Sequence, residues 1–364
     1  GQQMKHLKSF VYVSTAYSNC DRKHIEEKFY EPVLNDEETI TLLQHTKRHE
    51  QYIMEPIIRA HKPNSYIFTK SISEDIVRQN MQDLPLVVVR PSIVMPTLEE
   101  PMSYWLRNYN GFLSLVAGSG LGIIQVFHYT KTIKADFTPG DLTANCILAV
   151  GWHKATQPAS PQIYNCVGSD SNVLVHEMVH ETRRYYLASK EAVSKLVWKS
   201  HIVHAENTYL LFFLYYILHV IPGLFFSLAE LYLNRKPIIM KIYRKFFLFN
   251  TMVRYFACNE WLFANDNTTS LLTRLNPRDR ELFDFDMGSV SWLKFCSVLY
   301  RCVALYIIKD YTPYPKEVYK KKMRFIDPVD KAIVCSFKFL QFYLLLTVAR
   351  IVYSFLYSNV LCTY

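Results

Sequence analysis

The sequence predicts an α/β fold that contains part of a doubly wound parallel sheet, followed by a helical domain and an apolar C-terminal segment. Two apolar runs of strand length, at 9–17 and 84–96, flank a segment with helical periodicity at 65–81. A strand, a crossover helix and a second strand form the unit of a parallel α/β sheet. Half of the 364 residues are hydrophobic and 20% are charged, as expected for a globular body with one or two apolar segments.

Each element follows from its own residues. The run "SFVYVSTAY" is rich in β-branched and aromatic residues, which is typical of a buried strand. In the helix, Ile67, Ile72, Ile76 and Val77 form an apolar face. The second strand, "LPLVVVRPSIVMP", ends at its prolines. The charged stretch before the helix is long for a connection inside such a sheet, so we expect a surface insertion with its own helices.

The net charge of +9 narrows the class of partner. Basic residues gather beside apolar segments, in "NRKPIIMKIYRKFF" at 234–247 and "KEVYKKKMR" at 316–324. This placement favours a membrane surface or an anionic substrate, and it argues against nucleic acid as a partner. The eight cysteines are scattered without a Cys-x-x-Cys pair, so neither a disulfide scaffold nor a structural zinc site is predicted.

Three short motifs resemble functional sites. His176 and His180 in "HEMVH" have the spacing of two zinc ligands, but no third ligand follows at a suitable distance, so we predict no metal site. The glycines of "GSGLG" at 118–122 follow no strong strand, which favours a flexible loop on the substrate side over a phosphate-binding loop. The glycosylation sequon at Asn267 is expected to go unused on the cytosolic side of a membrane.

The stretch "PNSYIFTKSISE" at 63–74 places Tyr66 and Lys70 one helical turn apart. Such a pair on its own is most often an ordinary solvated pair. It gains meaning from Ser14 and Thr15, because these hydroxyls lie where the first strand ends, and ligands of open α/β sheets bind at the carboxyl ends of strands.

A hydroxyl at a strand end, then Tyr-x-x-x-Lys, then a strand closing in Arg-Pro-Ser resembles the extended short-chain dehydrogenases and reductases, which have a Rossmann-type sheet. The match narrows to the alcohol-forming fatty acyl-CoA reductases through "FVYVSTAYSN", "PNSYIFTKSISE" and "VVVRPSIVMPTLEEPMSYWLRNYNG". Segments from "LLFFLYYILHVIPGLFFSLAEL" through "NEWLFANDNTTSLL" and "LFDFDMGSVSWLKF" to "YIIKD" resemble the helical domain that this family shares with plant male-sterility proteins. Together the matches span nearly the whole chain.

The resemblance implies that the protein uses NADPH to reduce a long-chain fatty acyl-CoA, through a thiohemiacetal that expels CoA and then an aldehyde, to the primary alcohol. Tyr66 would donate the proton, and Lys70, as an ammonium beside the phenol, would stabilise the phenolate and hold the nicotinamide ribose. Thr15, or less readily Ser14, would donate a hydrogen bond to the carbonyl oxygen. The residues implied to bind the cofactor are Tyr66, Lys70, Pro91, Ser92, Ile93 and Val94.

The chain departs from the family pattern in two places. Nothing before residue 9 supplies the first strand and glycine-rich turn that would hold the cofactor pyrophosphate, so we expect an N-terminally truncated chain that is inactive alone. The stretch "TPGD" at 138–141 replaces the usual Pro-Val-Asp, and its glycine removes a side chain beneath the site. Two alternatives stay open: a membrane sterol or lipid dehydrogenase of the same superfamily, and a truncated, non-catalytic membrane protein.

Two apolar segments bear on localisation. The segment at 333–357 is long enough to span a bilayer, with Lys338 and Arg350 near its ends. The basic residues before it predict an anchor with the body in the cytosol, and a membrane-lying helix or a core hairpin stays open as an alternative. We expect the membrane to be that of the endoplasmic reticulum or the peroxisome. The run at 209–229 is interrupted by Pro222 and Gly223, which leaves a lipid-facing hairpin and a buried helix pair equally open. A homodimer is also left open.

These observations divide the chain into five expected segments. They are the C-terminal part of a reductase domain at 1–170, a connecting segment at 171–205, the helical domain at 206–312, a basic linker at 313–332 and a membrane-anchoring segment at 333–358.

Overall fold

The computed structural model describes residues 3–59, 61–82, 84–107, 111–168, 172–189, 197–309, 320–321, 323–332 and 334–336, and positions 339, 343, 346, 347 and 350. Of the 26 residues in the expected membrane-anchoring segment at 333–358, 18 therefore lie outside the described residues, as does the first part of the basic linker, at 313–319.

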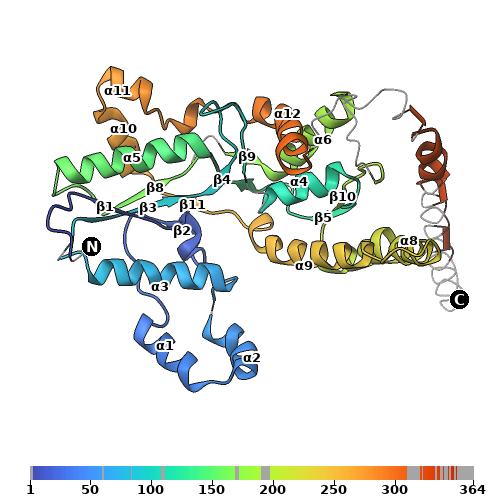
Figure 1. Ribbon diagram of the computed structural model, residues 1–364, viewed down its shortest axis with the longest axis horizontal. Coiled ribbons are helices and arrows are strands. Elements are labelled where there is room, and N and C mark those ends of the chain that lie inside the picture. The colour runs from blue at the N-terminus through green and yellow to red at the C-terminus, as the bar shows by residue number, and fades with distance from the viewer. Residues whose placement is uncertain are drawn as a thin grey trace, which may run out of the picture.

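The centre of the described fold is a parallel sheet of three strands in the order β1-β3-β8. These strands are β1 (Phe10–Val13), β3 (Leu86–Pro91) and β8 (Ile163–Cys166). Every residue of β3 and β8 is buried, which explains their continuous apolar character. Figure 1 shows α3 (Ser65–Gln79) on one face of this sheet and α5 (Gly140–Thr156) on the other. The α/β class and the parallel arrangement agree with the sequence prediction.

The single strand expected at 84–96 is two strands. The chain changes partners at Ser92, whose N–H donates to the Cys166 carbonyl at 3.1 Å, whereas the next N–H, of Ile93, donates to the Asp136 carbonyl at 3.2 Å. From there β4 (Ile93–Met95) pairs in parallel with β7 (Phe137–Pro139) instead of continuing the central sheet. Short-range sequence patterns cannot reveal such an exchange, because both halves are equally apolar.

Three further strand pairs surround the centre. β5 (Val126–His128) pairs with β10 (Val203–Ala205), β6 (Lys134–Ala135) with β9 (Val173–Leu174), and β2 (His24–Ile25) with β11 (Leu262–Phe263). Helices α4 (Phe112–Gly120) and α6 (Val175–Ser189) pack near the first two pairs. The charged insertion carries two helices, α1 (Asp36–His45) and α2 (Arg48–Ile58), which project from the body below α3 in Figure 1. An insertion with its own helices is what the sequence predicted.

The C-terminal half is helical. It contains α7 (Thr208–Tyr215), a π-helical turn η3 (Tyr216–Val220), α8 (Ile221–Tyr232) and α9 (Ile239–Ala257), then α10 (Asp266–Arg274), α11 (Pro277–Leu282) and α12 (Trp292–Cys302). Among the described residues, one helical stretch, Thr208–Tyr232, is long and apolar enough to cross a membrane by length and composition, with a mean hydropathy of 1.9.

The hydrophobic core crosses the boundary expected at residue 206. Strand β2, from the first part of the chain, is paired with β11 from the second. Tyr17 packs edge-on against Phe256, Trp261 and Phe263. The Glu27 carboxylate accepts hydrogen bonds from the backbone N–H of Asn165, at 2.8 Å, and of Asn267, at 2.6 Å. Both parts of the chain thus contribute to one packed body.

Candidate active site

Helix α3 begins immediately before the Tyr-Lys pair. Asn64 is its N-cap, with a side chain that accepts a hydrogen bond from the Ile67 N–H at 2.9 Å. Tyr66 is therefore the second residue of the helix, and its side chain is 56% exposed. Within the described part of the chain, the Tyr66 hydroxyl has no hydrogen-bond partner, so it is free to face a ligand.

Lys70 connects α3 to the end of β1. Its ammonium donates a hydrogen bond to the Val13 carbonyl at 2.9 Å and lies 5.2 Å from the centre of the Tyr12 ring. Val13 is the last residue of β1 and directly precedes Ser14 and Thr15. The structure thus brings the Lys70 side chain to the carboxyl end of the strand that carries the two predicted hydroxyls.

The two hydroxyls have different surroundings. Thr15 caps the 3-10 turn η1 (Ala16–Asn19), because its Oγ1 accepts a hydrogen bond from the Tyr17 N–H at 3.3 Å. Accepting that bond leaves the Thr15 proton available for donation. Ser14 is buried and its N–H donates to the Val89 carbonyl, but its Oγ has no partner among the described residues.

The residues predicted to line the cofactor run from Pro91 at the end of β3 into β4. Pro91 and Ser92 are buried, Ile93 is partly buried and Val94 is 48% exposed. The Ser92 Oγ, like that of Ser14, has no hydrogen-bond partner in the described part of the chain. Buried hydroxyls in folded proteins are nearly always hydrogen-bonded. Two unpartnered hydroxyls at the carboxyl ends of neighbouring strands therefore fit a polar ligand such as a dinucleotide at this edge.

A buried charge pair beneath this edge was not identified from the sequence. Arg90 is completely buried, and its guanidinium binds both carboxylate oxygens of Glu74, with Nε–Oε1 and Nη2–Oε2 distances of 3.0 and 2.7 Å. Glu74 lies one turn beyond Lys70 on α3 and also accepts from the Ser18 hydroxyl at 2.9 Å. This bidentate pair fixes α3 against β3 and η1. The sequence did contain one signal of this pair, because Arg90 lies inside an otherwise apolar strand.

Lys62 makes a second buried contact with η1. Its ammonium donates to the Ser18 carbonyl at 3.0 Å and to the Asp21 carboxylate at 2.6 Å. Burial raises the pKa of Asp21, but the Lys62 ammonium outweighs that effect and lowers it overall. Lys62 precedes the Tyr66 and Lys70 pair and Glu74 follows it, and both bind Ser18 of η1. The turn after β1 is therefore joined to α3 on both sides of the pair.

The "TPGD" stretch has a structural role beside the site. A Cβ at Gly140 would lie 3.3 Å from the Met95 carbonyl oxygen, so the glycine permits β7 and β4 to approach closely. The Asp141 carboxylate accepts hydrogen bonds from the backbone N–H groups of residues 98, 99 and 100, at 2.8, 2.8 and 3.1 Å. The loop that follows β4 is thereby held against the start of α5.

The three lookalike motifs have ordinary structural roles. In "GSGLG", Gly118 lies in α4, and a Cβ at Gly122 would lie 1.8 Å from the Trp198 carbonyl oxygen, so these glycines serve close packing. His176 Nδ1 contacts the Tyr129 hydroxyl at 3.0 Å, and no group of three His, Cys, Asp or Glu side chains within the described ranges could hold a metal. The Asn267 amide donates a hydrogen bond to the Ile163 carbonyl at 3.0 Å.

Sequence comparisons place both halves of the chain in one family. A model described as male sterility protein matches residues 1–147, and a second model with the same description matches residues 218–310. The chain is 33% identical over 313 residues to the fatty acyl-CoA reductase wat of Drosophila melanogaster, covering 85% of this chain and 60% of that protein. It is 30% identical to fatty acyl-CoA reductase 1 of Rattus norvegicus, covering 81% of this chain and 57% of that protein.

Solved structures align more distantly. The terminal R domain of the myxalamid PKS-NRPS pathway shares 13% identity, with a TM-score of 0.43 over 80% of this chain and 58% of that chain. RMD from Pseudomonas aeruginosa complexed with NADPH shares 8%, with a TM-score of 0.36 over 82% of this chain and 66% of that chain. The chain spans less than two thirds of the length of its first curated relatives. Since both male sterility models match it in order, and those relatives align over more than four fifths of its residues, the chain belongs to the male sterility protein family.

Proposed function

We propose that this protein reduces a long-chain fatty acyl-CoA to the primary alcohol, through an aldehyde, with NADPH as the reductant. The observation that carries the proposal is the contact between the Lys70 ammonium and the Val13 carbonyl, because it joins the Tyr66 and Lys70 helix to the strand end that holds Ser14 and Thr15. Relatives that are 30 to 33% identical and are fatty acyl-CoA reductases support the choice of substrate. A Rossmann-type sheet of the extended short-chain reductase class is part of the same proposal.

The cofactor would be held by Tyr66 and Lys70 from α3 and by residues 91–94 from the junction of β3 and β4. The unpartnered Ser14 and Ser92 hydroxyls support this location, since each could hydrogen-bond to a polar ligand there. When bound, NADPH would supply the hydride.

The side chains of this chain would handle the charge and the proton. Oxygen gains negative charge as a carbonyl carbon is reduced, so it needs donors aimed at it. Thr15, which keeps its proton while it caps η1, or Ser14 would donate a hydrogen bond to that oxygen. Tyr66 would donate the proton to the same oxygen, and the Lys70 ammonium would stabilise the phenolate that remains.

The membrane is part of the proposal as well. Residues 333–358 would form an anchor that leaves the body in the cytosol, at the endoplasmic reticulum or the peroxisome. Long-chain acyl-CoA partitions into membranes through its acyl chain, so an anchored enzyme would meet its substrate at the surface.

The test is an assay of the full-length protein with palmitoyl-CoA, because this chain alone is expected to be inactive. NADPH oxidation, thiol release and lipid products are measured together. Two hydrides are needed to take a thioester to an alcohol, so two NADPH should be consumed for each CoA released, with hexadecanol as product. Parallel assays with NADH test the choice of cofactor. Reduction of a sterol ketone without any turnover of acyl-CoA would replace the proposal with the sterol or lipid dehydrogenase alternative.

A further inference from the structure

The outer side of α8 is an exposed apolar stripe. Ile221, Leu224, Phe225, Leu228 and Leu231 follow the i, i+3, i+4, i+7 spacing of one helix face, and each is at least 49% exposed. Phe225 reaches 70% and Leu228 63%. Helix α7 continues the exposed apolar character on the N-terminal side, with Tyr209 at 88%. A contiguous surface of this kind marks an interaction site.

The inner side of the same stretch is fixed to the protein body at α7 and η3. Leu211 and Leu214 of α7 are buried against Val126 and Ala205 of the β5–β10 pair. In η3, the His219 Nε2 accepts a hydrogen bond from the backbone N–H of Gln125 at 3.1 Å. A helix that crosses a bilayer must meet lipid or another membrane segment on every side. This stretch could do so only by breaking those buried contacts, so its geometry favours lying on a surface.

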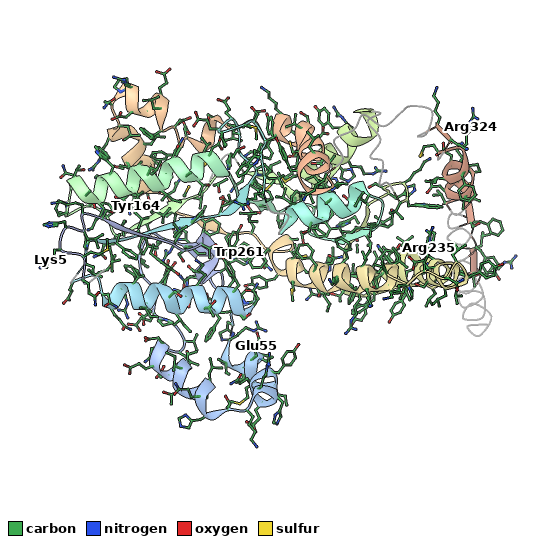
Figure 2. The ribbon with its side chains drawn as sticks, in the orientation of Figure 1. Lys5, Glu55, Tyr164, Arg235, Trp261 and Arg324 are labelled. Carbon is green, nitrogen blue, oxygen red and sulfur yellow. The ribbon has the colours of Figure 1, made fainter. Side chains whose placement is uncertain are left out.

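Basic residues follow the apolar stripe in the sequence and lie in the next turn and on the next helix. Arg235 and Lys236 lie in the turn between α8 and α9, and Lys241, Arg244 and Lys245 are on the exposed side of α9. Among the described residues, none of the five forms an ion pair. Figure 2 shows Arg235 at the end of the molecule where Figure 1 places α8 and residues 320–332. A cluster of free cations beside apolar side chains matches the layered chemistry of a membrane surface, with anionic headgroups above acyl chains.

We infer that α7, α8 and α9 form a membrane-docking surface that lies in the headgroup layer of an anionic bilayer, parallel to the membrane plane. A second copy of the chain fits this surface less well, because a two-fold contact would bring the five cations against themselves. The surface is separate from the expected anchor at 333–358. It would orient the body, whereas a single anchor with a linker would only tether it.

The test uses the full chain bound to vesicles of phosphatidylcholine, with or without phosphatidylserine. The vesicles contain a trace lipid with a diazirine either near the headgroup or at the end of its acyl chain, and cross-linked peptides are mapped by mass spectrometry. We expect the headgroup-proximal probe to label residues 208–233, at least about fivefold more strongly when phosphatidylserine is present. Peptides of α2 serve as the control, because Ile53 and Ile57 there are also exposed.

Matched variants separate the surface from the anchor. Leu224→Ser with Leu228→Ser should reduce labelling of 208–233 by about tenfold without changing labelling of the C-terminal region, and Ile53→Ser with Ile57→Ser should change neither. Lys241→Gln with Lys245→Gln should weaken the phosphatidylserine effect, by up to about fivefold per lysine. Equal labelling of 208–233 by the acyl-end probe would mean that the helix spans the bilayer. That result, no labelling of 208–233, or wild-type labelling in the double serine variant would overturn the inference.

Discussion

The edge formed by α3, β1 and β3 and the surface formed by α7, α8 and α9 are built in opposite ways. At the edge, the charges of Arg90 and Glu74 are buried, whereas the Tyr66 side chain is 56% exposed. On the α7–α9 surface, the buried side holds few polar groups, chiefly His219 and Asn250, and the exposed side combines apolar side chains with lysines and arginines. The arrangement at the edge can hold individual polar atoms in fixed positions, whereas the α7–α9 arrangement offers a broad exposed surface.

The difference fits the two roles proposed above, reduction of a carbonyl at the edge and docking to a membrane at the α7–α9 surface. A reacting carbonyl needs donors within hydrogen-bond distance, and small displacements of those donors are costly to the rate. A bidentate ion pair with defined angles is suited to hold a helix that carries such donors. A bilayer is fluid and has no fixed partner atoms, so a docking surface needs apolar area and charge, and its side chains need no fixed geometry.

The largest expected effect comes from a substitution that removes the proposed proton donor at the edge and leaves the packing there intact. In the full-length protein, Tyr66→Phe removes the hydroxyl and keeps the ring, so alcohol formation should fall by about two to four orders of magnitude, the size of a general-acid contribution. Because Tyr66 is exposed and its hydroxyl is unpartnered within the described residues, the melting temperature should hardly move. Tyr52→Phe, on exposed α2, is the control. Retention of most NADPH-dependent activity by Tyr66→Phe would contradict the proposed role.

The next largest effect is expected when the buried ion pair of Arg90 and Glu74, which fixes α3 against β3, is broken. Arg90→Met leaves the Glu74 carboxylate buried and without its bidentate partner, so the free energy of unfolding should fall by about 3 to 5 kcal/mol. Arg184→Met breaks an exposed ion pair with Glu181 and should cost at most about 1 kcal/mol. Urea unfolding of both variants measures the difference. If the two variants lost similar stability, the Arg90 and Glu74 pair would not be what fixes α3.

The sequence predicted the parts of this edge that depend on local patterns. Helix 65–81 is observed as Ser65–Gln79, because the Asn64 cap and the apolar spacing are both local signals. The first strand is shorter than predicted, and it ends at Val13, since Thr15 already caps the turn that follows. The exchange of partners at Ser92 depends on carbonyls of residues 136 and 166, which no local pattern brings together.

Prediction of the site had the same limit. The spacing of Tyr66 and Lys70 could be read from the sequence, but the contact of Lys70 with Val13 joins residues 57 positions apart. Glu74 appears in the sequence as one more charged helix residue, and only the fold shows that it is buried beneath Arg90. The role of each predicted residue in catalysis stays a prediction.

A smaller effect probes the polar contact inside the α7–η3–α8 stretch. Burial lowers the pKa of His219 to about 4, whereas an unfolded histidine titrates near 6.5. Between those values the unfolded chain binds the extra proton, so the stability from neutral His219 is complete above about pH 6.5 and is lost as the pH falls towards 4. At pH 5 the loss should reach about 2 kcal/mol. Thermal unfolding at pH 7.5 and 5.0 should show a weaker pH dependence in His219→Gln than in wild type; an unchanged dependence would exclude His219 as its source.

The smallest expected effect is also the sharpest test of the contrast between the two regions. Leu228 is 63% exposed on α8, so Leu228→Ser should change the free energy of unfolding by less than about 0.5 kcal/mol in solution. Leu214, one helix earlier, is buried against the β5–β10 pair, and Leu214→Ala should cost about 2 to 5 kcal/mol. Both are leucines in the same apolar run, and hydropathy alone ranks them equally. Urea unfolding of the two variants therefore shows which side of the run holds the fold, and a large loss in Leu228→Ser would mean that this side is covered by protein and has no free surface to offer a membrane.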